Sequence, residues 1–153
     1  MGVEFYQPFM KESSVPVIWG KTYEILIHSR AAIVSSGTAT LETAILNVPQ
    51  VVVYQLNPRG LFIFLKKFFL KTRWVSLVNI ILGREAVVEL IQADFTLKNV
   101  ISELGKILND PENEKRMLAD YRDVMIKLGD PGASKRAAGL MVSKLNASKT
   151  VLQ

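Results

Sequence analysis

The stretch Ala31-Ala32-Ile33-Val34-Ser35-Ser36-Gly37-Thr38-Ala39-Thr40-Leu41-Glu42 decides the fold of this chain. Its first four residues form an apolar run that is too short for a helix and predicts a buried strand. After Gly37, apolar residues at positions 41, 44 and 45 follow helical spacing, so a helix is expected over residues 38–46. A strand that turns on a glycine into a helix aims unpaired backbone N–H groups at one point. The helix dipole adds roughly half a positive charge there, so this turn is a candidate site for a phosphate or diphosphate.

The side chains around the turn fit such a ligand. Gly37 lacks the Cβ that would block close approach of the backbone, and Ser36, Thr38 and Thr40 can donate hydrogen bonds. Glu42 would repel an anion at the same point, so it is better placed to one side, where it can accept hydrogen bonds from neutral hydroxyls such as those of a ribose. Alternatively, Glu42 only complements the helix dipole, an interaction worth about 0.3–1 kcal/mol.

The next segment completes a repeating unit of strand, helix and strand. Asn47 can end the helix in a left-handed conformation, and Pro49 prevents its continuation. Residues 51–54, Val-Val-Val-Tyr, show no polar alternation, which is typical of a parallel strand that is covered on both faces. The chain is therefore predicted to have an α/β fold with a right-handed βαβ crossover. Ligands in such sheets bind beyond the carboxyl ends of the strands, where the Gly37 turn would lie.

Weaker signals predict further elements. The run at residues 15–19 contains Pro16 and suits an edge strand or the start of a strand. Residues 22–29 can form a short helix, and residues 75–77 a short strand. Over residues 85–92 a helix would place its polar groups on one side, where they suit a hydroxyl-rich ligand or a solvated face: Glu85, Glu89 and Gln92.

The C-terminal part of the chain is predicted to be helical. Apolar stripes at helical spacing mark helices over residues 96–108, 112–128 and 133–145. The side chains expected to face inward are Leu97, Val100, Ile101, Leu104, Ile107 and Leu108 in the first helix, Met117, Leu118, Tyr121, Val124, Met125 and Leu128 in the second, and Ala137, Leu140 and Met141 in the last. We expect an N-terminal arm or linker at 1–14, a partial domain at 15–145 and a loose tail at 146–153.

Residues 61–74 have the most unusual composition in the chain. Their apolar run is far shorter than the roughly 20 residues that span a bilayer. Large apolar and basic side chains are combined in one segment, as in interfacial helices on anionic membranes: Phe62, Phe64, Lys66, Lys67, Phe68, Lys71 and Trp74. A buried helix whose lysines extend to water is the alternative explanation.

The overall composition excludes several classes of function. The chain has 153 residues, of which 49% are hydrophobic, so it can bury a core. It contains no cysteine and one histidine, which makes a metal site unexpected. The net charge is +5, but the basic residues are scattered and no aromatic platform accompanies them, so we expect no nucleic-acid partner.

Several separate motifs resemble the C-terminal part of bacterial lipid-A-disaccharide synthase. They occur in the right order and spacing over residues 15–145. They are Ser36-Gly37-Thr38-Ala39-Thr40-Leu41-Glu42, Pro49-Gln50-Val51-Val52-Val53-Tyr54, Val75-Ser76-Leu77-Val78-Asn79, Gly83-Arg84-Glu85, Glu89-Leu90-Ile91-Gln92 and Pro131-Gly132-Ala133-Ser134. The family usually has a proline at the positions of Val78 and Val88.

The resemblance implies one half of a glycosyltransferase with two Rossmann-like domains (GT-B type), which needs no metal or other cofactor. Such enzymes transfer 2,3-diacylglucosamine from a UDP carrier to 2,3-diacylglucosamine 1-phosphate (lipid X) in lipid A and lipopolysaccharide biosynthesis. They work in the cytoplasm at the surface of the inner membrane of Gram-negative bacteria. Both substrates are acylated and lie at the membrane surface, which would explain a basic apolar segment that binds membranes.

The resemblance also assigns residues. Loop 36–40, with Ser36, Gly37, Thr38, Ala39 and Thr40, would contact the diphosphate, and Glu42 the ribose. Four later residues would lie near the donor sugar or the phosphates: Asn79, Arg84, Glu89 and Gln92.

The resemblance covers neither the acceptor-binding domain, to which the general base belongs, nor the first strand and loop of the nucleotide domain. The fragment is therefore expected to have little activity alone. Family members exchange C-terminal segments in a dimer, and an incomplete sheet favours self-association. The alternative function is a non-catalytic module that dimerises or binds membranes through residues 61–74.

Overall fold

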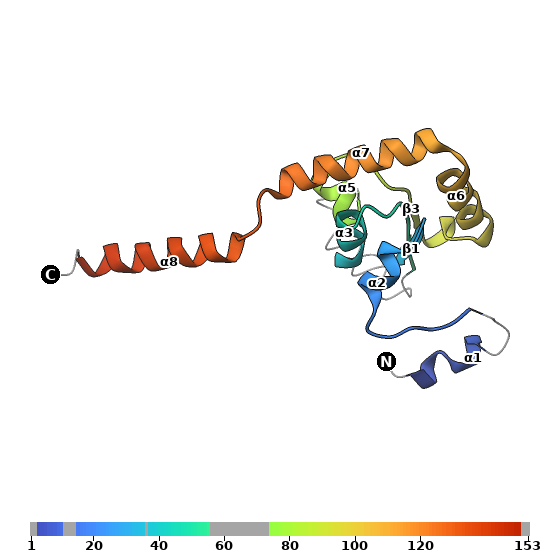
Figure 1. Cartoon of the computed structure of the whole chain (residues 1–153), viewed down its shortest axis with the longest axis horizontal. Coiled ribbons are helices and arrows are strands. Elements are labelled where there is room, and N and C mark those ends of the chain that lie inside the picture. Colours follow the sequence, from blue (N-terminus) through green and yellow to red (C-terminus); the bar gives the residue numbers. More distant parts are fainter. Residues whose placement is uncertain (1–2, 11–14, 36, 56–73, 151–153) are drawn as a thin grey trace.

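A parallel sheet forms the centre of the molecule (Figure 1). The computed structural model describes residues 3–10, 15–35, 37–55 and 74–150. Within these ranges the sheet has three strands in the order β1-β2-β3, namely β1 (Ala32–Ser35), β2 (Gln50–Tyr54) and β3 (Glu89–Ile91). Helix α3 (Thr38–Ile45) connects β1 to β2, and both strand pairs are parallel. The predicted βαβ unit and α/β fold class are therefore confirmed.

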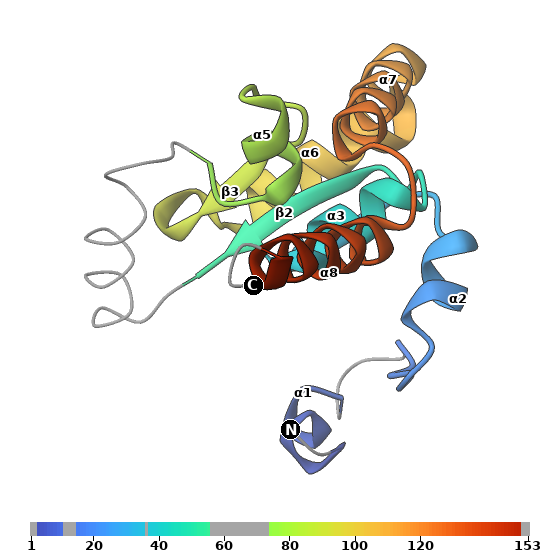
Figure 2. The ribbon, with the colours of Figure 1, turned by 90° about the vertical axis from the view of Figure 1, so that its left-hand side faces the viewer.

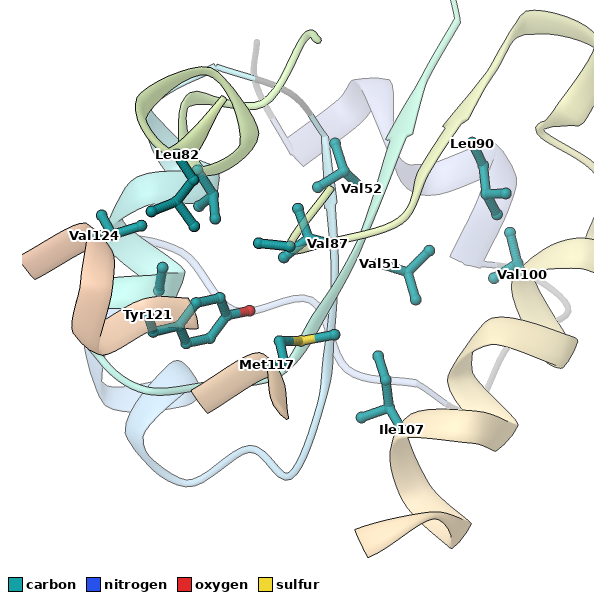
Figure 3. Close-up of a cluster of buried hydrophobic side chains, with 13 residues drawn as sticks. Val51, Val52, Leu82, Val87, Leu90, Val100, Ile107, Met117, Tyr121 and Val124 are labelled. Carbon is teal, nitrogen blue, oxygen red and sulfur yellow. The ribbon is translucent and has the colours of Figure 1, made fainter. Parts of the chain in front are cut away.

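Helices cover both faces of this sheet. Helix α3 packs on one face together with α5 (Leu77–Leu82) and α7 (Pro111–Leu128), and α6 (Leu97–Asn109) covers the other face. Figure 3 shows Val51 of β2 pointing toward Val100 and Ile107 of α6, whereas Val52 points to the opposite side. Both valines are completely or almost completely buried, so β2 is the central strand of a covered sheet, as its unbroken apolar sequence predicted.

The two long helices of the body begin at side-chain caps. The Thr96 hydroxyl accepts a hydrogen bond from the Asn99 amide, and the Asp110 carboxylate accepts from the amides of Glu112 and Asn113. These bonds satisfy N–H groups that have no partner inside the helix. The predicted helices over 96–108 and 112–128 are confirmed.

The inward stripe that we expected on α6 is only half right. Val100 and Ile107 are buried against the sheet. Leu97, Ile101 and Leu108, however, are 76%, 61% and 41% exposed. The reason is geometric, because a single helix on a sheet buries a narrow stripe, and no described element covers the adjacent stripe.

Helix α8 (Ala133–Thr150) projects away from the sheet in Figure 1 and points toward the viewer in Figure 2, which is turned by 90°. The helix is confirmed, but the expected inward face of Ala137, Leu140 and Met141 is exposed, at 71% and 67% for the latter two. The helix also continues to Thr150, past residue 146, where we expected a loose tail.

The N-terminal part contains short helices and no strand among its described residues. Helix α2 (Thr22–Ile27) lies inside the predicted range of 22–29. Residues 15–19, expected as a strand, lie outside the sheet with exposed side chains. The expected arm includes η1 (Val3–Phe5) and α1 (Gln7–Met10), and the ring of Tyr6 packs edge-on against Trp19 at 5.2 Å between centroids.

Two local predictions are wrong. Residues 75–77 form no strand, because the Ser76 hydroxyl accepts from the Asn79 amide and caps α5. Residues 85–92 form no helix, because the chain pairs with β2 as strand β3 and then enters the short 3-10 helix η3 (Gln92–Asp94). The expected common face of Glu85, Glu89 and Gln92 therefore does not exist.

Most of the expected membrane-binding segment lies outside the described residues. This applies to Phe62, Phe64, Lys66, Lys67, Phe68 and Lys71. Trp74 is described and is partly buried. Within the described ranges, no helix combines the length and the apolar character needed to cross a bilayer.

A pair of methionines on α7 tests this packing. Met117 is 2% exposed and belongs to the core. Met125 and Leu128, which we also expected to face inward, are 44% and 43% exposed, because they lie on the edge of the stripe that the sheet leaves uncovered. We expect Met117→Ala to lower the free energy of unfolding by about 2–5 kcal/mol, because it removes buried contacts and leaves a cavity. Met125→Ala should change it by no more than about 0.5 kcal/mol. Urea unfolding followed by circular dichroism measures both, and equal effects would contradict this orientation of α7.

Candidate functional site

The turn between β1 and α3 has a backbone conformation that only glycine adopts readily. Gly37 is the N-cap of α3 with φ +110° and ψ −153°. A Cβ at this position would meet no atom within 4 Å, so the positive φ is what favours glycine here. No side chain of a described residue caps this helix, and Thr38 and Ala39 of its first turn are exposed. The expected contact at Ser36 lies outside the described residues.

Thr40 does not point to the solvent as a free donor. It is completely buried, its hydroxyl donates to the Gly37 carbonyl at 2.8 Å, and it accepts from the Leu77 amide at 3.2 Å. Leu77 is the first residue of α5, so this hydroxyl ties the starts of two helices together. Thr40 therefore supports the turn from inside.

Glu42 lies beside a hollow next to the turn. It lines a pocket of about 240 Å³ between α2, β1 and α3, together with Ser35 at the end of β1 and Ala39 one turn before Glu42. Thr22 and Leu26 of α2 form the opposite wall. Glu42 is partly buried and lines this pocket from the side of α3.

Glu89 and Asn79 form a second polar cluster. Glu89 accepts hydrogen bonds from the amides of Val75 and Ser76, both at 2.9 Å, and from the Asn79 side-chain amide, also at 2.9 Å. The Asn79 oxygen accepts from the amides of Ala86 and Val87, which it holds in an extended loop. Asn79 is completely buried, so both side chains are occupied with holding α5 against β3.

The structure does not bring Arg84 to the Gly37 turn. Arg84 follows the C-terminus of α5, at the opposite end of that helix from the Thr40 contact. Its guanidinium pairs with Asp120 and Asp123 of α7, each at 2.6 Å. The hydrogen bonds that Arg84 donates to Asp123 and Asp120 raise its pKa. Its contacts are those of a clamp between α5 and α7.

Gln92 lies at the same edge of the sheet as the turn. It follows directly on β3, and carboxyl ends of parallel strands share one edge. Its φ of +53° is unusual for a residue other than glycine. Within the described ranges, no group of three or more His, Cys, Asp or Glu side chains could hold a metal ion.

A buried hydrogen-bond chain behind the turn was missed by the sequence reasoning. Gln50 of β2 donates through Nε2 to the Thr40 carbonyl at 2.9 Å and to the Tyr121 hydroxyl at 3.2 Å. Tyr121 donates in turn to the Val48 carbonyl at 3.2 Å, and its burial raises the pKa of its hydroxyl. A polar Gln50 at the start of an otherwise apolar strand was the available signal, because buried amides need partners.

Comparison with known proteins then identifies the family. The model of the family described as lipid-A-disaccharide synthetase matches residues 4–142. The chain belongs to the lipid-A-disaccharide synthase family. Its match includes the Gly37 turn, Glu42, and the Asn79 and Glu89 cluster.

Curated lipid-A-disaccharide synthases agree with this assignment. The synthase of Syntrophus aciditrophicus is 34% identical over 134 residues, which are 88% of this chain and 34% of that protein. The synthase of Gloeothece citriformis is 38% identical over 122 residues, 80% of this chain and 32% of its own length. That of Solibacter usitatus is 36% identical over 138 residues, 90% of this chain and 36% of its own. The chain thus spans about a third of the length of these lipid-A-disaccharide synthases.

Two glycine substitutions test the conformation of the turn. We expect Gly37→Ala to destabilise the fold by about 1–3 kcal/mol, because residues other than glycine rarely adopt φ +110° with ψ −153°. Gly105 lies inside α6, and a Cβ there also meets nothing within 4 Å. Gly105→Ala should therefore stabilise by about 0.5–1 kcal/mol. Urea unfolding gives both values, and a change of the same sign in both variants would refute the strained turn.

A second pair of variants tests the role of Glu89. Glu89→Gln replaces one accepting oxygen by an amide that faces N–H donors, so we expect a loss of about 1–3 kcal/mol. Glu85 is exposed, and Glu85→Gln should change stability by no more than about 0.5 kcal/mol. Hydrogen exchange at the amides of Val75 and Ser76 should accelerate only in the first variant. Unchanged exchange there would show that the carboxylate does not hold this segment.

Proposed function

We propose that this chain carries part of the UDP-sugar donor site of a lipid-A-disaccharide synthase. The diphosphate would bind the N-terminus of α3 at Gly37, and Glu42 would accept hydrogen bonds from the ribose. One observation carries the proposal. A helix start that no described side chain caps lies at the carboxyl edge of a parallel sheet, beside a pocket of about 240 Å³ that Glu42 lines.

The spacing along α3 suits a nucleoside diphosphate. Glu42 stands four residues after Thr38, or about 6 Å along a helix that rises 1.5 Å per residue. A ribose is bonded directly to the phosphate chain, so phosphates at the helix start bring its hydroxyls within reach of an acid one turn on. The pocket volume beside Glu42 and Ala39 leaves room for the nucleoside.

The proposed reaction needs stabilisation of a leaving group. A hydroxyl of the acyl-glucosamine phosphate acceptor attacks the anomeric carbon of UDP-2,3-diacylglucosamine, and the bond from that carbon to the diphosphate breaks. The hydroxyl proton passes to a general base, which we place in the acceptor-binding half of the full enzyme. Negative charge grows on the departing UDP, and the N–H groups and dipole of α3 oppose it with fixed positive charge.

The proposal divides the expected site residues into two roles. Gly37, Thr38, Ala39 and Glu42 would contact the nucleotide, because they are exposed or line the pocket. Thr40, Asn79 and Glu89 would support the site from inside, since their polar atoms bond to the protein. Gln92 would face the sugar from the neighbouring strand end, whereas Arg84 is left out of the contact set.

The acceptor, the inner-membrane surface and a dimer with exchanged C-terminal segments remain proposals that follow from the family. In that setting the whole enzyme would work from the cytoplasmic side of the inner membrane.

Titration of the isotope-labelled chain with UDP tests the donor site. We expect amide shifts in NMR spectra to concentrate on residues 35–43, with smaller changes near Gln92. Glu42→Gln should weaken UDP binding about tenfold, because it removes a charged acceptor of ribose hydroxyls, but leave the binding of inorganic diphosphate unchanged. Glu24→Gln, at an exposed acid of α2, serves as the matched control.

The outcomes separate cleanly. If Glu42→Gln weakened the binding of UDP and of diphosphate equally, the Glu42 carboxylate would not be bonded to the ribose hydroxyls. UDP shifts that fall outside residues 35–43 would refute the placement at α3.

A further inference from the structure

The hydrogen-bond chain behind the Gly37 turn connects it to the middle of α7. From the Tyr121 hydroxyl, the path runs through the Gln50 side-chain amide to the Thr40 carbonyl, and the Thr40 hydroxyl then donates to the Gly37 carbonyl. Its distances are 3.2, 2.9 and 2.8 Å. All three side chains are completely buried, so no solvent competes for these bonds.

We propose that Tyr121 and Gln50 are positioning residues that set the direction of the α3 N–H groups toward the donor phosphates, acting through Thr40. This inference rests on the proposed function and deepens it. It assigns a role in nucleotide binding to two residues that lie behind the turn and outside the pocket that Glu42 lines.

The conformation of the Gly37 turn must be fixed by contacts from outside the turn. A glycine has the widest choice of backbone conformations, and the N-cap of α3 has no side-chain cap among the described residues. The direction of the first amides therefore depends on what holds the Gly37 carbonyl. That carbonyl accepts from both the hydroxyl and the amide of Thr40, at 2.8 and 3.3 Å.

Gln50 fixes the position of α3 relative to α7 because its side-chain amide donates a hydrogen bond to each of them. One bond goes to α3 and the other to α7, so the side chain cannot rotate without breaking one of them. Helix α7 is the longest element packed on this face, and Tyr121 is anchored there by its own bond to the Val48 carbonyl. A change at Tyr121 should therefore reach the turn.

A purely structural role makes a different prediction, and Gln50 allows the two to be separated. Its Oε1 atom is buried without a hydrogen-bond partner among the described residues. Gln50→Met keeps the length of the side chain, removes this unpaired oxygen and breaks the bonds to Thr40 and Tyr121. Stability should hold or rise, because an unpaired buried acceptor is costly, whereas the orientation of the turn should be lost.

The experiment uses the 153-residue chain in three variants, Gln50→Met, Tyr121→Phe and Val124→Ala. Val124 is as buried as Tyr121 and lies on the same helix, which makes it the control for lost packing. Amide shifts and hydrogen exchange of Gly37, Thr38 and Ala39 are first measured without ligand. UDP affinity is then measured by titration, and unfolding by urea.

In Gln50→Met and Tyr121→Phe we expect displaced amide shifts at these three residues, faster exchange, and UDP binding weakened by at least about fivefold. Val124→Ala should lose stability but keep both the shifts and the affinity. Unchanged shifts at the turn in Gln50→Met, or losses of affinity that follow stability across all three variants, would overturn the inference. If the turn moves but the parent chain binds no UDP, the hydrogen-bond chain does position the turn, and the proposed donor site is refuted. If UDP binds equally to all variants, the donor site is supported, and the positioning role of Tyr121 and Gln50 is refuted.

Discussion

The hydroxyl of Thr40 is the contact on which the arrangement of the site depends. It is completely buried, and its donor bond to the Gly37 carbonyl and acceptor bond from the Leu77 amide use it in both directions. Two helices that are separated by more than thirty residues of chain therefore start at one point, at the carboxyl edge of the sheet. A hydroxyl suits this position because it donates and accepts through one small atom, which neither an amide nor a carboxylate does.

The two helix starts that Thr40 joins differ in electrostatics. At α5 the Ser76 hydroxyl caps the helix and the Glu89 carboxylate lies on the amides just before it, so the protein supplies its own anion. The far end of α5 is neutralised as well, because Lys127 donates to the carbonyls of Ile81 and Leu82. At α3 no described side chain occupies the corresponding position. The proposed donor phosphates would therefore be attracted to the start of α3 and not to that of α5.

Sequence reasoning succeeded where a local pattern agreed with the packing. The apolar run before Gly37, and Pro49 before the next strand, were enough for the βαβ unit, and apolar stripes at helical spacing marked the two long helices α6 and α7. It failed over residues 85–92, where polar groups happened to follow helical spacing. The Asn79 oxygen holds the amides of Ala86 and Val87 there, and pairing with β2 uses the next residues, so tertiary contacts override the local period. The solvent exposure of apolar side chains on α6 and α8 could not be predicted either, because an apolar stripe does not indicate which of its residues a neighbouring element covers.

The Gln50 Oε1 atom, which is buried without a hydrogen-bond partner among the described residues, indicates what the Gln50 amide contributes to the interior. A methionine would fill the same volume without burying an acceptor, and a glutamine with one unsatisfied atom costs about 1–3 kcal/mol. The amide is compatible with a stable core only because its Nε2 bonds to Thr40 and Tyr121 offset that loss. Those bonds are not needed to hold the backbone, since β2 already pairs with β1 and β3, and α3 packs against β1 and β2. What they add is a fixed relation between α7 and the turn at Gly37. The proposed donor site would bind phosphates through backbone amides, and the direction of those amides would depend on such contacts behind the turn.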